Sequence, residues 1–95
     1  MGKIKKHDVL LAAVELAAIS GYLRVTRDAI ADRAGVSMGS VTNYLGTIKQ
    51  IRRAIVRHAI RTEHLVIIAH AIVNKDPLTN KVNKTLRARA MESVL

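Results

Sequence analysis

The chain has 95 residues, a net charge of +9 and no cysteine, so it suits one small domain without disulfides or cysteine-bound zinc. The strong positive charge indicates an anionic partner, most often nucleic acid. The longest apolar run, residues 65–73, is shorter than the ~20 residues that span a bilayer, and the basic N-terminus lacks a clear signal-peptide pattern. We therefore expect a cytoplasmic protein without a membrane partner.

Helical periodicity dominates the chain, and strand alternation is absent. The apolar spacing predicts a first helix over residues 7–20. Thr26 is a good N-cap for a second helix, which should end at Gly35. Ser37 is an N-cap for a third helix, which should end near Gly46.

An apolar stripe predicts a long fourth helix over residues 48–73, and Pro77 interrupts the pattern because proline cannot continue a helix. A short last helix is expected over residues 78–94. The sequence thus predicts an all-α fold in one compact domain. Its two regions are a helix-turn-helix DNA-binding region, 1–47, and a long helix with a C-terminal helix, 48–95, as the dimerisation region.

The spacing of small, glycine and apolar residues predicts a helix-turn-helix over residues 26–46. Ala31 allows two helices to cross closely, Gly35 tolerates the positive φ of the turn, and Val41 anchors the second helix to the first. An ordinary helical hairpin would show any one of these features. Their combination with two N-caps and a basic composition favours binding of double-stranded DNA.

Three segments carry a family resemblance: residues 9–16 (VLLAAVEL), Gly21-Tyr22, and residues 30–41 (IADRAGVSMGSV). Together they resemble the DNA-binding domain of TetR-family repressors, over about residues 7–60. The resemblance implies a TetR-like three-helix fold and a dimeric repressor of a bacterial or phage-infected cell. It also implies that the third helix of each subunit enters the major groove, and the symmetry of such a dimer predicts a pseudo-palindromic operator.

The sequence departs from the family pattern at several positions. Thr42 stands where the family usually has a phosphate-binding tyrosine, Ala17 replaces a usual phenylalanine, and Ile48-Lys49 replaces a usual Lys-Glu pair. Residues 48–95 are also too few for the usual ligand-binding domain. We therefore expect no small-molecule ligand and no cofactor.

The third helix supplies the predicted base contacts, which are Met38, Gly39, Thr42 and Asn43. The Asn43 amide can form two hydrogen bonds with an adenine, and Met38 can pack on a thymine methyl group. Hydroxyl groups, backbone N–H groups and cations are the usual phosphate ligands. The predicted DNA-backbone contacts are Thr26, Arg27, Ser37, Ser40, Tyr44 and Lys49.

A basic N-terminal arm of Lys3, Lys5 and Lys6 could follow the backbone or enter a minor groove. A solvated N-terminus is the alternative. The arginines Arg53, Arg57 and Arg61 recur at four-residue steps along the fourth helix, either as a solvated face or as a further phosphate-binding stripe.

The C-terminal half is apolar on more than one side, and the N-terminal helix carries the unexpected apolar residues Leu11 and Ile19. A second copy of the chain would cover such surfaces. The predicted dimerisation residues are Val66, Ile68, Ile72, Val73 and Leu86. The alternative is that the C-terminal helices bury these side chains within one chain.

The sequence gives little evidence for a metal site or a catalytic site. His58, His64 and His70 are six residues apart, a step that turns them in divergent directions on a helix. No nucleophile motif, phosphate-binding glycine loop or pair of carboxylates is present. We expect a non-enzymatic protein without a metal.

The hypothesis favoured by these patterns is a sequence-specific, double-stranded DNA-binding transcriptional regulator, a small dimeric repressor of phage or plasmid type. One alternative is an architectural or replication-accessory protein with low sequence specificity. Another is a protein-interaction module that acts through its apolar C-terminal helices.

Overall fold

Helices are the only regular secondary structure over residues 5–94, which are the residues that this computed structural model describes. The N-terminal elements are α1 (Lys6–Ser20), the 3₁₀ turn η1 (Tyr22–Arg24), α2 (Arg27–Ala34) and α3 (Met38–Leu45). The C-terminal elements are α4 (Ile48–Thr62), α5 (Leu65–Val73), the 3₁₀ turn η2 (Pro77–Lys81) and α6 (Lys84–Glu92). The predicted all-α fold class is confirmed.

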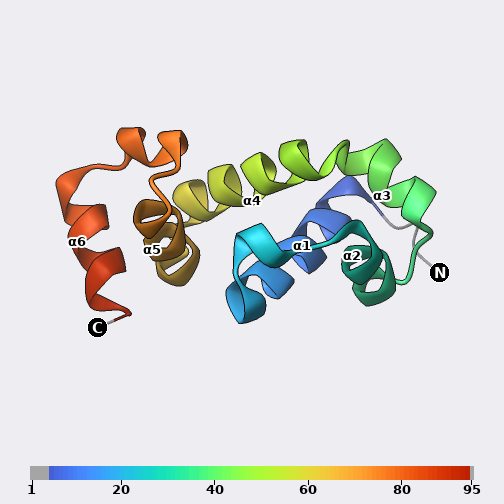
Figure 1. Ribbon diagram of the computed structural model, residues 1–95, viewed down its shortest axis with the longest axis horizontal. Coiled ribbons are helices and arrows are strands. Elements are labelled where there is room, and N and C mark those ends of the chain that lie inside the picture. Colours follow the sequence, from blue (N-terminus) through green and yellow to red (C-terminus); the bar gives the residue numbers. More distant parts are fainter. Residues whose placement is uncertain (1–4, 95) are drawn as a thin grey trace.

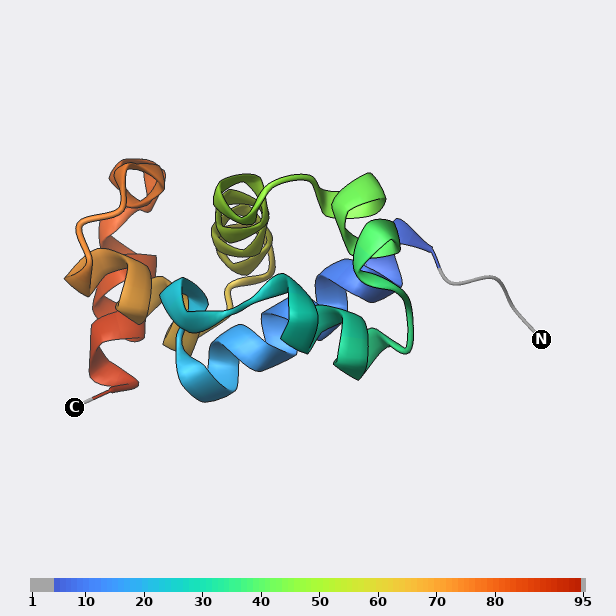
Figure 2. The same cartoon turned by 45° about the vertical axis from the view of Figure 1, so that its right-hand side comes forward.

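The molecule is elongated, with extents of 41 × 25 × 21 Å. Helices α2 and α3 lie at one end and α5 and α6 at the other, with α1 and α4 running between them (Figure 1). A turned view, in which α4 is seen nearly end-on, shows the same separation of the two ends (Figure 2). No helix within residues 5–94 is both long and apolar enough to cross a membrane.

Local capping explains where α2 and α3 begin and end. Thr26 Oγ1 accepts a hydrogen bond from the Ala29 N–H at 3.2 Å, and Ser37 Oγ accepts one from the Ser40 N–H at 3.1 Å. Gly35 follows α2 in the left-handed conformation, with φ 69° and ψ 35°. The boundaries predicted for these two helices agree with the structure.

The core joins α1, α3 and α4. Val9, Val41 and Ile55 are fully buried, and Ala31, which is 7% exposed, supports the close packing of α2 against its neighbours. The same packing fixes the orientation of α3, because its apolar side faces inward and its other side is left in solvent.

The predicted long fourth helix is wrong, because two helices replace it. Glu63 ends α4 in the left-handed conformation, with φ 55° and ψ 45°. His64 then caps α5, where its Nδ1 accepts a hydrogen bond from the Ile67 N–H at 3.5 Å. The break lets α5 pack against α4 and α6.

The last helix also begins later than predicted. Pro77 starts η2, whose first turn is capped by Asp76 through a hydrogen bond from the Leu78 N–H to Oδ1 at 3.0 Å. Asn83 then caps α6, with its Oδ1 accepting from the Leu86 N–H at 2.8 Å. Asparagine is among the strongest N-caps, so the helix begins at Lys84.

These turns change the expected dimerisation surface. Ile68 is fully buried and Leu86 is 7% exposed, so both belong to the core of a single chain, and their prediction as dimer contacts is corrected. The physical reason is that α5 packs between α4 and α6. Val66 and Ile72 are half-buried, and Val73 is 65% exposed.

Candidate nucleic-acid interface

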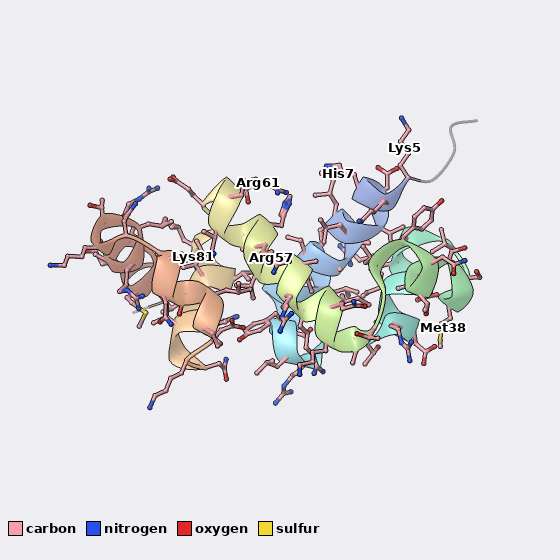
Figure 3. The ribbon with its side chains drawn as sticks, turned by 90° about the horizontal axis from the view of Figure 1, so that it is seen from above. Lys5, His7, Met38, Arg57, Arg61 and Lys81 are labelled. Carbon is pink, nitrogen blue, oxygen red and sulfur yellow. The ribbon has the colours of Figure 1, made fainter. Side chains whose placement is uncertain are left out.

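The outward side of α3 carries the four residues predicted to contact bases. They are all exposed: Met38, Gly39, Thr42 and Asn43. Val41 and Leu45 hold the opposite side of α3 in the core. The labelled Met38 side chain projects from the end of the molecule that α3 forms (Figure 3). An eight-residue amphipathic helix therefore presents polar and small side chains to solvent at one end of the protein.

The start of α2 adjoins this side of α3. Arg27 Nη1 donates a hydrogen bond to Thr42 Oγ1 at 3.4 Å. A hollow of about 250 Å³ has Thr26, Arg27 and Met38 in its walls. Residues predicted separately as backbone and base contacts thus lie on one continuous surface, which we call the α2–α3 surface.

The remaining α3 hydroxyl groups are less free than the sequence indicated. Ser37 Oγ lies 3.0 Å from Ser40 Oγ, and the Ser37 hydroxyl also caps the helix. Ser40 is half-buried, whereas Ser37 is exposed. Tyr44, near the end of α3, is 37% exposed. Ser37 and Tyr44 are therefore the more exposed of these three residues.

Gly39 is not required by the fold. A Cβ at this position would have Ser37 Oγ at 3.7 Å as its nearest neighbour, which is an ordinary contact distance. Alanine would favour the helix by about 1 kcal/mol over glycine. The absence of a side chain matters instead to whatever approaches α3 from outside, since glycine permits close contact with the backbone.

Helix α4 adds cations at the edge of the α2–α3 surface. Lys49 is exposed in its first turn. Arg52, which the sequence analysis missed, donates from Nη2 to the backbone oxygen of Leu23 at 2.8 Å. Arg52 also lines the hollow that contains Met38. Arg52 follows Lys49 by three residues and so lies on the same side of a helix. This spacing could have predicted it from the sequence.

Two of the three lysines of the predicted arm lie within the described residues. Lys5 and Lys6 are exposed where α1 begins, and Lys3 lies outside the described residues. The backbone N–H of Lys5 donates to Asp8 Oδ2 at 3.1 Å. The backbone of Lys5 is therefore anchored to the start of α1.

Tyr22 joins the two halves of the chain. It is 2% exposed, and its hydroxyl donates to Asp76 Oδ2 at 3.1 Å. Burial and the negative charge of Asp76 raise the pKa of Tyr22 to about 12. The phenol is therefore neutral and hydrogen-bonded at physiological pH.

Two of the histidines lie close together, since the ring centroids of His7 and His58 are 6.2 Å apart. His58 is 8% exposed, and its Nδ1 lies 3.3 Å from Arg61 Nη2. Burial lowers the pKa of His58, and the charges of Arg61, His7 and His64 lower it further. Within residues 5–94, no group of histidine and acidic side chains has the arrangement of a metal site.

A comparison with models of known protein families finds a match in the N-terminal half of the chain. The family model described as bacterial regulatory proteins, tetR family, matches residues 9–58. The match covers most of α1, all of α2 and α3, and most of α4. Comparisons with curated proteins and with solved structures gave no match.

Proposed function

This chain belongs to the tetR family of bacterial regulatory proteins, which are DNA-binding transcription regulators, and on that premise we propose that it is a sequence-specific repressor. It binds double-stranded DNA as a homodimer, with α3 of each subunit in a major groove. Two-fold symmetry then requires a pseudo-palindromic operator with two half-sites about one helical turn, or a multiple of it, apart.

The observation that carries this proposal is the composition of the exposed side of α3. Asn43 offers an amide donor and an acceptor, the pair that reads the N6 and N7 edge of adenine. Gly39 has no packing role in the fold, and it would let the helix approach the groove closely. Met38 is 43% exposed, which is unfavourable in water and favourable against a thymine methyl group.

Backbone contacts would orient α3 in the groove. Thr26 and Arg27 begin α2, where N–H groups and the positive end of the helix dipole favour a phosphate. Lys49 is exposed at the start of α4 and provides a further cation. Because these contacts release counterions, the affinity should fall steeply with salt.

Exposed apolar residues support a dimer. Val73 is 65% exposed and Ile19 is 73% exposed, although valine and isoleucine are among the residue types most often buried. Ile19 and His70 line one hollow of about 440 Å³, so the end of α1 adjoins α5. A second copy of the chain would cover these exposed apolar side chains.

The DNA test is selection of duplexes from a random pool at physiological salt. Wild type should enrich an inverted repeat, and Asn43→Ala should lose or relax one position in each half-site, at a cost of about 1–3 kcal/mol per subunit. Asn80→Ala is the matched control, because Asn80 is exposed on η2. Retention without enrichment would instead favour an architectural protein, and no retention would favour a protein-interaction module.

The dimer test is sedimentation equilibrium of Val73→Lys. A lysine at the last residue of α5 suits the helix dipole, so the fold should persist while the dimer dissociates. Ala88→Lys adds the same charge at an exposed position on α6 and should remain dimeric. A monomeric wild type, or equal dissociation of both variants, would contradict this interface.

A further inference from the structure

A third hollow lies between α4, η1 and η2. Its volume is about 450 Å³, within the range of ~300–1,000 Å³ that is typical of small-molecule sites. Three segments that are distant in sequence supply its walls, so it exists only in the folded chain. We call it the α4–η2 hollow.

One wall of the α4–η2 hollow is strongly cationic. It is formed by four side chains of α4: Lys49, Arg52, Arg53 and Arg57. Their spacing puts them on neighbouring positions of one helix side. Among residues 5–94, the ion pairs are formed by other arginines, and no carboxylate pairs with any of these four. Figure 3 shows Arg57 on the outer side of α4, well away from Met38.

The one acid in the hollow, Asp76, offsets only one of the four positive charges of this wall. Asp76 Oδ2 accepts a hydrogen bond from the Tyr22 hydroxyl at 3.1 Å, and Oδ1 accepts one from the Leu78 N–H at 3.0 Å. Both carboxylate oxygens are therefore engaged with the protein itself. The hollow keeps an excess of positive charge.

Arg52 is held in position and has an unmet hydrogen bond. Its Nη2 is fixed on the backbone oxygen of Leu23 at 2.8 Å. Its Nε is buried and has no hydrogen-bond partner among the described residues. A buried donor without an acceptor is unfavourable, so the Arg52 guanidinium keeps a hydrogen-bonding capacity that the fold does not use. Guanidinium groups suit carboxylate and phosphate oxygens.

The facing wall is apolar. Leu23, which is 45% exposed, lines it together with Pro77 and the half-buried Leu78. An inorganic ion would leave these side chains uncovered. The two walls together match a small molecule with one anionic group and an apolar body.

We propose that the α4–η2 hollow binds a small organic anion. Its phosphate or carboxylate contacts the guanidinium groups of Arg52, Arg53 and Arg57, and its apolar body packs on Leu23 and Leu78. This proposal goes beyond the DNA-binding function. It also replaces the expectation of no small-molecule ligand, which rested on the short length of residues 48–95.

The test is an NMR titration of the full chain, without DNA, that follows backbone amides and arginine Nε–H resonances. Phenyl phosphate is the probe, and inorganic phosphate and phenol are the controls for its two parts. We expect saturable shifts at Arg52, Arg53, Arg57 and Leu78, and at least about tenfold weaker binding of either control. Because no DNA is present, the result is independent of the proposed repressor function.

Two double variants distinguish binding in the α4–η2 hollow from nonspecific attraction to the positive charge of the protein. The double variant Arg53→Gln, Arg57→Gln should bind phenyl phosphate about tenfold or more weakly than wild type. Lys81→Gln with Lys84→Gln removes the same charge from exposed positions outside the hollow and should change affinity by less than about twofold. All four side chains are exposed, so the fold should tolerate both changes.

Three outcomes would overturn the proposal. The first is the absence of saturable shifts at tens of millimolar phenyl phosphate. The second is equal weakening by the two double variants. The third is binding of inorganic phosphate as tight as that of phenyl phosphate, together with shifts of the same arginines by a short DNA duplex. That result would assign the cations to the DNA backbone.

Discussion

Glu63 offers a direct test of the break between α4 and α5. Its left-handed conformation, φ 55° and ψ 45°, costs a residue with a Cβ about 1 kcal/mol, a cost that glycine avoids. Glu63 Oε1 also pairs with Arg89 Nη1 at 3.1 Å, but the side chains are 55% and 50% exposed, so this pair contributes at most about 0.5 kcal/mol. We expect Glu63→Gly to raise the free energy of unfolding by about 0.5 kcal/mol in total.

Glu63→Ala is the informative comparison, because both variants lose the ion pair and differ only in the Cβ. In the observed turn the glycine variant should be more stable than the alanine variant by about 1 kcal/mol. In a continuous helix the order would reverse by a similar amount. Thermal unfolding followed by circular dichroism resolves this difference, which corresponds to about 4–8 °C in Tm. A more stable alanine variant would refute the break.

Three further changes probe the capping, the α3 surface and the buried phenol. Thr47→Ala removes a cap in which Oγ1 accepts from the Gln50 N–H at 3.2 Å, and it should cost about 1 kcal/mol in denaturant unfolding; an unchanged midpoint would contradict the capping. Gly39→Ala should stabilise the chain by up to about 1 kcal/mol yet weaken DNA binding in a mobility-shift assay, and undiminished binding would argue against close approach by α3. Tyr22→Phe loses the hydrogen bond to Asp76 and should cost about 1 kcal/mol near neutral pH. Because folding raises the Tyr22 pKa from 10.0 to about 12, the wild-type advantage is fully present below pH 10 and should disappear as the pH rises towards 12. An advantage that persists at pH 12 would show that the phenol is not perturbed.

Much of the DNA-binding half follows from local chemistry. Thr26 and Ser37 satisfy N–H groups within three residues of themselves, and Gly35 supplies a left-handed turn. Such signals need no tertiary contact, so the sequence predicts where α2 and α3 begin and end. The outward side of α3 follows as well, because Val41 must face the core.

The C-terminal half depends on contacts that the sequence does not display. Glu63 adopts a conformation that residues with a Cβ rarely take, so no local pattern marks the end of α4. Once the chain turns there, α5 packs between α4 and α6, and Ile68 becomes core instead of surface. The α4–η2 hollow likewise requires Tyr22 and Asp76, 54 residues apart, to meet through one hydrogen bond. Sequence by itself determined the capped helices and the composition of their faces, because those are set by neighbouring residues. Tertiary structure decided which apolar faces remain exposed and which cations share a hollow, because both depend on a turn that only packing stabilises.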